Sequence, residues 1–254
     1  MYTDCVGTKI AGVLCRTATC LVAILTLAPI LRERAIASDE VEAAISRVPL
    51  STDEVVNNLV RRNAERSRNL FHSEAIRVYH LSYCGFPGNL EAEMTVEASY
   101  DSPATKEFKV LSQSGPKIIL DLVFKKLLEG EKESIQPQNS SQTQLNRENY
   151  DFALLSYDTA GDQYVLQVSP KRRSKFVYRG QIWVDGKDFA VTRIEAEPAQ
   201  SPSFWTKRSE IHHEYEKIQD FWLPVRNRSI SYIRLGGRAT LTIEYKNYHL
   251  GVGR

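Results

Sequence analysis

Hydrophobic and polar residues alternate along most of the chain, which is the pattern of β-strands that bury one face and expose the other. The clearest example is residues 90–100, where apolar side chains and Tyr100 fall on one face while glutamate, threonine and serine fall on the other. The same alternation recurs at residues 71–83, 107–113, 152–157, 164–169, 175–184, 189–195, 209–218, 225–235 and 238–248. The pattern therefore predicts about ten strands.

Glycine and aspartate mark the turns between several of these segments. Gly-Asp at 161–162, Asp-Gly at 185–186 and Gly-Gly at 236–237 each separate two alternating segments, as two-residue hairpin turns do. We therefore expect strands that follow one another in sequence to pair in an antiparallel sheet. Because strand twist accumulates, a sheet of this many strands should coil into an incomplete half β-barrel.

Two segments have helical periodicity instead. Ser51 and Glu54 fit a capping box at the start of the first, which carries apolar residues at helical spacing over 53–66. The second begins at Pro116 and extends to Leu128, with apolar residues around most of its circumference. We expect this second helix to be buried on more than one side, against or inside the curved sheet.

The predicted fold class is mainly β with α: an antiparallel half-barrel of about ten strands, covered by two or three helices that enclose an apolar cavity. One segment, 131–149, is polar and without periodicity. We predict that it is a flexible surface loop, and the alternative is a boundary between two domains.

The first 37 residues differ in kind from the rest. An apolar run at 21–31 follows basic residues and precedes an Ala-x-Ala sequence that ends at Ala37. This is the pattern of a secretory signal peptide, so we predict export to the periplasm and cleavage near Ala37, which leaves 38–254 as one domain. The charged residues 32–34 leave an uncleaved anchor as the alternative, although the run is shorter than the ~20 residues of a membrane-spanning helix.

Charge bears on the choice of partner. The chain has 33 basic and 31 acidic residues, and removal of the four basic and two acidic residues of the predicted signal leaves 29 of each. A neutral domain lacks the positive surface that phosphate backbones require, so we exclude nucleic acid as a partner and expect a monomer.

Two local features allow more than one interpretation. Cys84 is the only cysteine beyond the predicted signal, so we expect a small buried thiol without an internal disulfide. The basic cluster from Lys171 to Lys175 follows Pro170 between two predicted strands. It fits a solvated loop, and the alternative is contact with anionic lipid headgroups.

Catalytic motifs for nucleophilic, phosphate or dinucleotide chemistry do not occur in the sequence. His212 and His213 precede Glu214, but successive strand residues point to opposite faces, so we expect a solvated strand face and no metal site. The carboxylate pairs lie at turns or strand ends, where such residues bond the backbone; they are Asp185 with Asp188 and Glu195 with Glu197. We therefore predict neither an enzyme nor a cofactor.

Four segments carry a resemblance to a known family; they are residues 164–171, 180–195, 217–224 and 245–248. The first two, YVLQVSPK and GQIWVDGKDFAVTRIE, resemble outer-membrane lipoprotein-sorting proteins of the LolA/LolB-like periplasmic carrier superfamily. The resemblance implies a half-barrel closed by helices around an apolar cavity that shields acyl chains and needs no cofactor. It implies an acylated lipoprotein or lipid as ligand, with partner proteins at the inner or outer membrane.

The candidate cavity lining consists of apolar residues on the predicted strands and the second helix, together with two aromatic residues of a loop that are expected to mark a binding rim. They are Leu90, Met94, Val96, Tyr100, Phe108, Val110, Phe124, Leu128, Ile182 and Val184, with Phe204 and Trp205 from the loop. The alternative is that the lining residues fill a solid core and that the loop aromatics pack over the barrel mouth.

Three functions follow from these expectations. The first is a periplasmic carrier or chaperone that holds acyl chains during outer-membrane lipoprotein sorting. The second is a periplasmic sensor of envelope stress that binds lipid or lipoprotein with the same fold. The third is an enzyme that acts on lipid or glycan, which would require polar residues to converge in the cavity.

Overall fold

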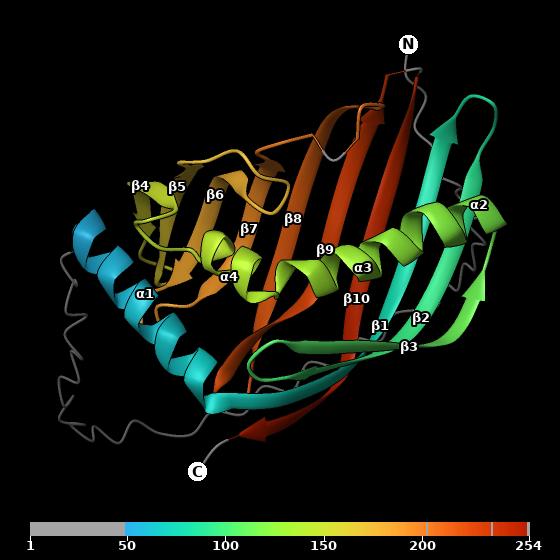
Figure 1. Ribbon diagram of the computed structural model, residues 1–254. Coiled ribbons are helices and arrows are strands. Elements are labelled where there is room, and N and C mark those ends of the chain that lie inside the picture. Colours follow the sequence, from blue (N-terminus) through green and yellow to red (C-terminus); the bar gives the residue numbers. More distant parts are fainter. Residues whose placement is uncertain (1–48, 202, 235, 253–254) are drawn as a thin grey trace, which may run out of the picture. The chain divides into compact units, whose positions relative to one another are not determined.

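The computed structural model describes residues 49–201, 203–234 and 236–252, which form one antiparallel sheet with helices across one of its faces (Figure 1). The predicted signal peptide therefore lies outside the described residues. The strands are β1 (Leu70–Gly85), β2 (Leu90–Asp101), β3 (Thr105–Ser114), β4 (Tyr150–Asp158), β5 (Gln163–Pro170), β6 (Tyr178–Asp185), β7 (Val191–Pro198), β8 (Thr206–Ile218), β9 (Phe221–Ile233) and β10 (Gly237–Val252).

The sheet is open, with β3 and β4 as its two edges. Its ten strands follow the order β3-β2-β1-β10-β9-β8-β7-β6-β5-β4. The predicted class, mainly β with an incomplete barrel, is confirmed, and each of the ten predicted segments forms a strand. The prediction that sequence neighbours always pair was wrong at one point, because β3 and β4 lie at opposite edges and β1 pairs with β10.

The connection between β3 and β4 explains this order, because it is long enough to cross the sheet. It contains α2 (Lys117–Ile119), the π-helical turn η1 (Leu120–Phe124), α3 (Lys125–Ser134) and α4 (Pro137–Thr143). The elements α2, η1 and α3 are continuous, and we call them the crossing helix. Figure 1 shows the crossing helix and α4 in front of the sheet, between its two edges.

Helix α1 (Thr52–Asn69) covers the same face near the β4 edge (Figure 1). The predicted capping box is present. The Glu54 amide donates to Ser51 Oγ (3.3 Å), and the Glu54 carboxylate accepts from the Ser51 amide (2.9 Å). These bonds satisfy amide groups that the first helical turn leaves without partners.

The segment 131–149 is not a simple loop. Residues 131–134 complete α3, and α4 occupies 137–143 with Pro137 at its first turn. Proline lacks the amide hydrogen that a first turn does not need, so it starts a helix even in a polar sequence that has no apolar periodicity. The prediction of a structureless segment was therefore wrong for these residues.

The predicted turns do join antiparallel neighbours, but the prediction of two-residue turns was wrong: four residues separate β4 from β5, five separate β6 from β7, and three separate β9 from β10. Asp162, Gly236 and Gly237 all adopt positive φ angles, of 47°, 88° and 125°. A Cβ atom at Gly237 would also lie 2.7 Å from the Tyr83 hydroxyl, so the turn between β9 and β10 requires glycine for space as well as for conformation.

Candidate functional site

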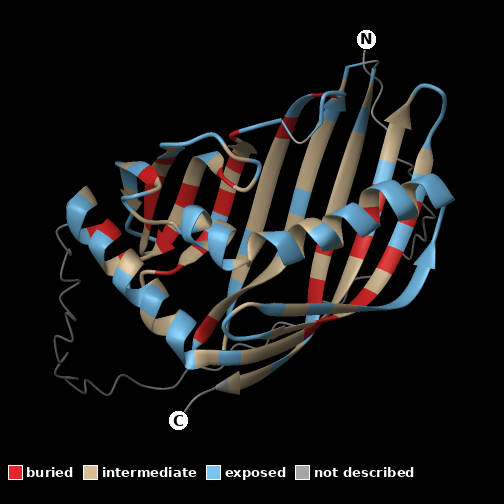
Figure 2. Ribbon diagram, in the orientation of Figure 1, coloured by how far each residue is buried: buried red, intermediate tan, exposed pale blue. Residues whose placement is uncertain are grey.

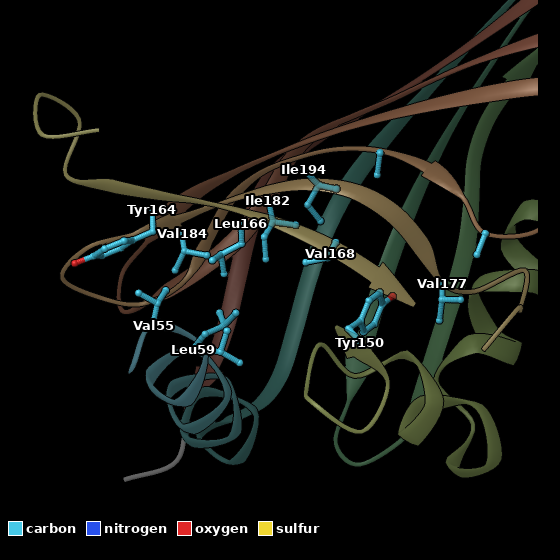
Figure 3. Close-up of a cluster of buried hydrophobic side chains, with 13 residues drawn as sticks. Val55, Leu59, Tyr150, Tyr164, Leu166, Val168, Val177, Ile182, Val184 and Ile194 are labelled. Atoms are coloured by element: carbon cyan, nitrogen blue, oxygen red, sulfur yellow. The ribbon is translucent and has the colours of Figure 1, made fainter. Parts of the chain in front are cut away.

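Two separate hydrophobic clusters lie on the face of the sheet that the helices cover, which we call the inner face (Figure 2). In the first, the α1 cluster, Val55, Val56 and Leu59 of α1 are fully buried. Figure 3 shows Val55 and Leu59 beneath the side chains of the overlying strands. The cluster also contains Tyr150, Tyr164, Leu166, Val168, Val177, Ile182, Val184, Ile194, Ala196 and Ala199.

The second cluster, which we call the crossing-helix cluster, lies near the β3 edge. Phe124 is 1% exposed and makes an edge-on contact with Tyr79, with ring centroids 6.1 Å apart. The other buried members are Leu81, Ala92, Met94, Val96, Ala98, Ile243 and Tyr245.

Strand β9 lies between the two clusters and presents small polar side chains to the inner face. Ser229 is opposite Ile211 of β8 on one side and Leu241 of β10 on the other. Ile211 packs against the α1 cluster and Leu241 against the crossing-helix cluster, so Ser229 marks the boundary between them. Asn227 and Ser231 share its face, because side chains two residues apart point the same way. We call the inner face of β9 at Asn227, Ser229 and Ser231 the seam.

Residues near the seam are deeply surrounded by protein, yet they keep accessible surface. His213 pairs with Asn227, and burial, together with the neighbouring His212, lowers the pKa of His213 to about 4. Burial raises the pKa of Tyr215 to about 12 and raises that of Tyr178 well above its usual range. All three residues are nevertheless only half-buried. The surrounding protein therefore removes much of the water from these groups, although part of each residue stays accessible.

The seam also holds a polar group with unused hydrogen-bonding capacity. Asn227 Nδ2 donates to the Tyr245 hydroxyl (2.7 Å), whereas Asn227 Oδ1 has no hydrogen-bond partner within the described ranges. The hydroxyl groups of Ser209 and Ser231 bond each other at 2.8 Å. A buried acceptor without a partner is costly, so a hydroxyl or amide donor that reaches Asn227 Oδ1 would gain a favourable bond.

An ion cluster attaches the crossing helix to the sheet. Glu131 Oε2, on α3, accepts from Arg77 Nη1 of β1 and from Lys106 Nζ of β3, both at 2.7 Å. The Tyr79 hydroxyl lies 3.4 Å from the other carboxylate oxygen. The Arg77 guanidinium also lies 4.9 Å from the centroid of the Tyr245 ring. The side chains of Arg77 and Lys106 are only 13% and 15% exposed, so these charges are largely removed from water.

The charges of this cluster support one another. Burial opposes ionisation of Glu131, but Lys106 and Arg77 outweigh it and hold the pKa of this carboxyl group below its usual range. Burial lowers the pKa of Lys106, and Glu131 partly offsets the effect. The cluster therefore stays charged near neutral pH, and removal of one member leaves uncompensated charge in a nearly dry site.

The outward side of the crossing helix is uncovered. Ile118 and Leu122 are 61% and 52% exposed, although Phe124 is buried. The expectation that this helix is buried on more than one side was therefore wrong. An open sheet presents only one face to the helix, so the helix can bury only one stripe of its apolar surface.

The predicted lining residues fall in different places. Met94, Val96 and Phe124 are buried in the crossing-helix cluster, with Phe108 and Leu128 packed against it. These five residues come from two strands and the crossing helix, so the structure brings part of the predicted set together.

The remaining predicted residues lie elsewhere. Ile182 and Val184 are buried in the α1 cluster. Leu90 and Tyr100, on β2, are half-buried, and Val110 on the edge strand is 47% exposed. Phe204 and Trp205 are 76% and 54% exposed in the loop between β7 and β8, outside both clusters.

Sequence reasoning missed the seam and the ion cluster. Asn227, Ser229 and Ser231 alternate with bulkier residues, but small polar side chains normally indicate the solvated face of a strand. Arg77 shares the alternation phase of Tyr79 and Leu81, and this phase is the signal that it points inward.

The candidate reactive groups show no convergence. His213 faces inward, whereas His212 and Glu214 are on the opposite face of β8. Asp185 Oδ1 accepts from two backbone amides of its own turn. Asp188 bonds Lys217 and Trp222. Within the part of the chain that the structure describes, no three His, Cys, Asp or Glu side chains lie close enough together to hold a metal ion.

Cys84 differs from its prediction. It is half-buried and takes part in a disulfide, so the expectation of a small buried thiol was wrong. Strand β1 ends at Gly85, beside the turn to β2.

Two depressions occur on the outer face of the sheet. One, of about 370 Å³, is lined by residues that include His80, Glu91 and Thr242. The other, of about 440 Å³, is lined by residues that include Arg179 and His212. Both are lined mainly by polar residues of the face away from the helices, so neither is the expected apolar cavity.

The comparisons with known proteins concern the fold. No family model and no curated protein matches the sequence. A solved structure of a DUF1329 family protein from Desulfovibrio piger is similar, with 14% sequence identity, a TM-score of 0.41, and coverage of 81% of this chain and 95% of that one.

Two further structures are named for the family that the sequence resembles. An outer membrane lipoprotein-sorting protein domain from Vibrio parahaemolyticus is 12% identical, with a TM-score of 0.40 and coverage of 80% of this chain and 95% of that one. A LolA superfamily protein from Nitrosomonas europaea is also 12% identical, with a TM-score of 0.33 and coverage of 80% and 94%. Among the described residues, no helix is both long and apolar enough to cross a bilayer.

Proposed function

We propose that this protein is a periplasmic carrier that holds the acyl chain of a lipid or lipoprotein against the seam. The observation that carries the proposal is the row of small side chains, Asn227, Ser229 and Ser231, between two clusters of large apolar ones. A ligand laid along the seam would contact Ile211 on one side and Leu241 on the other.

The driving force would be hydrophobic. Each methylene group removed from water contributes about 0.8 kcal/mol, so even part of a long acyl chain gives useful affinity without specific polar contacts. Tyr178 and Tyr215 would add broad ring surfaces beside the chain. Asn227 Oδ1 would accept a hydrogen bond from an amide or hydroxyl group at the polar end of the ligand.

We also propose that the protein is located in the periplasm. The apolar run at 21–31 and the Ala-x-Ala sequence ending at Ala37 support export across the inner membrane with cleavage near Ala37. The disulfide of Cys84 argues for the uncleaved chain instead, because the three other cysteines all precede Ala37. Cell fractionation followed by N-terminal sequencing tests this step. A protein that stays in the cytoplasm would contradict it.

Ligand binding is tested directly on purified protein. We expect lipid to be found by mass spectrometry after solvent extraction, and we expect the delipidated protein to take up a fluorescent fatty acid. Protein that neither carries lipid nor binds the fatty acid would contradict the carrier proposal.

One substitution distinguishes a hollow seam from a solid core. Ser229→Trp should fold normally and abolish fatty-acid uptake, because the indole ring would occupy the space assigned to the ligand. Ile230→Trp is the matched control, since Ile230 is the next residue of β9 and points to the outer face. If Ser229→Trp instead unfolds the protein while Ile230→Trp does not, the seam is already filled and the proposal fails.

A further inference from the structure

One edge of the sheet gathers six connections that are far apart in sequence. Four cross-strand pairs place them side by side: Gly85 with Gly237, Thr206 with Ile233, Tyr178 with Pro198, and Tyr150 with Pro170. The last of these pairs brings the segment 144–149, which leads into β4, beside the connection that follows β5. The sixth connection follows β3, where Gly115 lies against Ala92 near the start of β2. This edge is the upper one in Figure 1. We call the part of this edge that is formed by residues 86–89, 115–117, 171–177, 199–201, 203–208, 234 and 236–238 the basic rim.

The basic rim carries positive charge only, whereas the segment 144–149 at the same edge carries one charge of each sign, Arg147 and Glu148. The sequence of the rim contains no aspartate or glutamate. Its cations are Lys117, Lys171, Arg172, Arg173, Lys175, Lys207, Arg208, Arg234 and Arg238, and all nine are exposed. The opposite edge has the reverse balance over residues 101–105, 158–163, 185–191 and 218–221. It carries one cation, Lys187, and the carboxylates Asp101, Asp158, Asp162, Asp185, Asp188 and Asp220.

The described residues neutralise only some of these cations. Lys171, Lys175 and Arg208 pair with carboxylates that lie outside the rim. Within the described ranges, no carboxylate lies within salt-bridge distance of the other cations; they are Lys117, Arg172, Arg173, Lys207, Arg234 and Arg238. A concentration of free positive charge on one edge attracts an anionic surface over a distance of about 10 Å.

Large apolar side chains project from the same rim. Phe86, in the turn between β1 and β2, is 80% exposed, and Phe204 and Trp205 are 76% and 54% exposed. Ile118, beside the rim on the crossing helix, is 61% exposed. These residues belong to three separate connections, so the apolar groups are spread along the rim and do not form one compact patch.

Arg234 holds the loop between β7 and β8, which carries Phe204 and Trp205 and which we call the aromatic loop. The Arg234 amide donates to the Trp205 carbonyl oxygen, and Arg234 Nε donates to the Phe204 carbonyl oxygen, both at 2.8 Å. The Arg234 guanidinium also lies 5.5 Å from the centroid of the Phe204 ring. The two aromatic rings are therefore fixed in an exposed position by backbone hydrogen bonds, although little else covers them.

We propose that the basic rim docks the protein on the surface of an anionic lipid bilayer. Aromatic side chains favour the headgroup region, and lysine and arginine favour anionic phosphates, so a bilayer can satisfy both kinds of group at once. A folded acidic protein would need matching pockets for Phe86, Phe204 and Trp205 at three separate positions, whereas a bilayer needs none. The docking does not depend on a ligand at the seam.

The test uses the full protein as it is purified after export, with vesicles of equal parts phosphatidylcholine and phosphatidylglycerol. We expect co-sedimentation that weakens as salt is added, and much weaker binding to pure phosphatidylcholine. The double substitution Arg172→Ala/Arg173→Ala should weaken the apparent Kd about 25-fold, because each basic residue near an anionic surface contributes about five-fold.

Matched variants test whether vesicle binding depends on the residues of the basic rim or on any exposed cation or aromatic residue of the protein. Lys125→Ala/Lys126→Ala removes two adjacent exposed cations from α3, and it should change vesicle binding less than two-fold. Phe204→Ser/Trp205→Ser should weaken binding, whereas Phe71→Ser, at an exposed aromatic residue at the start of β1, should not. Circular dichroism confirms that each variant is folded.

Insertion of the aromatic loop has its own readout. Vesicles that contain brominated lipid should quench tryptophan fluorescence, and Trp205→Phe should remove most of the quenching although Trp183 and Trp222 remain. Equal loss of binding in the rim and control variants, or binding that is unaffected by the rim variants, would overturn the proposal. In the second case, an acidic protein surface becomes the partner that the rim fits.

Discussion

The two helices that cover the inner face are held by different kinds of interaction. Helix α1 buries Val55, Val56 and Leu59 completely, whereas the crossing helix has one fully buried side chain, Phe124, and an ion cluster at Glu131. Aliphatic contacts are lost only when apolar surface returns to water, but charged groups regain hydration when they separate. We infer that α1 is a permanent part of the core and that the crossing helix is the element that an entering ligand displaces.

The ion cluster gives the largest expected effect. Glu131→Gln should lower the free energy of unfolding by about 3–5 kcal/mol, because it leaves the cations of Arg77 and Lys106 buried without a counter-charge. Urea denaturation measures the change. Glu129→Gln, at an exposed position of the same helix, should cost less than about 0.5 kcal/mol. If both variants lose the same small amount, the cluster does not hold the crossing helix.

The α1 cluster should respond differently. Leu59→Ala should lower the free energy of unfolding by about 3–4 kcal/mol, since the side chain is fully buried and its removal leaves a cavity. Fatty-acid uptake by the folded fraction should stay unchanged, whereas Glu131→Gln should accelerate it. Asn57→Ala, at an exposed position of α1, serves as the control. Faster uptake in Leu59→Ala would remove the distinction between the two helices.

The fold was predictable where the signal is local. Alternation identified every strand, because each strand has one apolar face, and Ser51 with Glu54 marked the start of α1 correctly. The pairing of β1 with β10 was not predictable, since it joins segments that are far apart in sequence and no turn motif encodes it. The candidate site was predictable only in part. Met94, Val96 and Phe124 do meet, but the seam resembles a solvated strand face.

Acid should lower the free energy of unfolding through protonation of His213, which lies on β8 beside the seam. His213 has a pKa of about 4 in the folded protein, below the usual 6.5, so the unfolded chain binds its proton first as the pH falls. The free energy of unfolding should therefore decrease between pH 6.5 and pH 4, by about 3 kcal/mol in all. His213→Gln should remove this part of the pH dependence, whereas His212→Gln, on the outer face, should keep it. If the free energy of unfolding depends on pH in the same way in the wild type and in His213→Gln, His213 is not the group responsible.

The smallest expected effect concerns the first turn of α1. Ser51→Ala should lower the free energy of unfolding by about 1 kcal/mol, because the Glu54 amide loses its acceptor. Thermal unfolding measures the shift, and Ser51→Asp should largely restore stability. The crossing helix has no side-chain cap at Pro116, so Pro116→Ala should have a smaller effect than Ser51→Ala.

Strand β10 determines when the sheet can assemble. It pairs with β9 on one side and with β1 on the other, although it follows all the other described strands in sequence. A growing polypeptide can therefore form β1–β3 and β4–β9 only as two separate half-sheets. The edge strands β1 and β9 then lack the partner that β10 provides, and apolar surface stays exposed to water. The sheet can therefore close only after all 16 residues of β10 have emerged, and until then the unpaired edges of β1 and β9 favour aggregation.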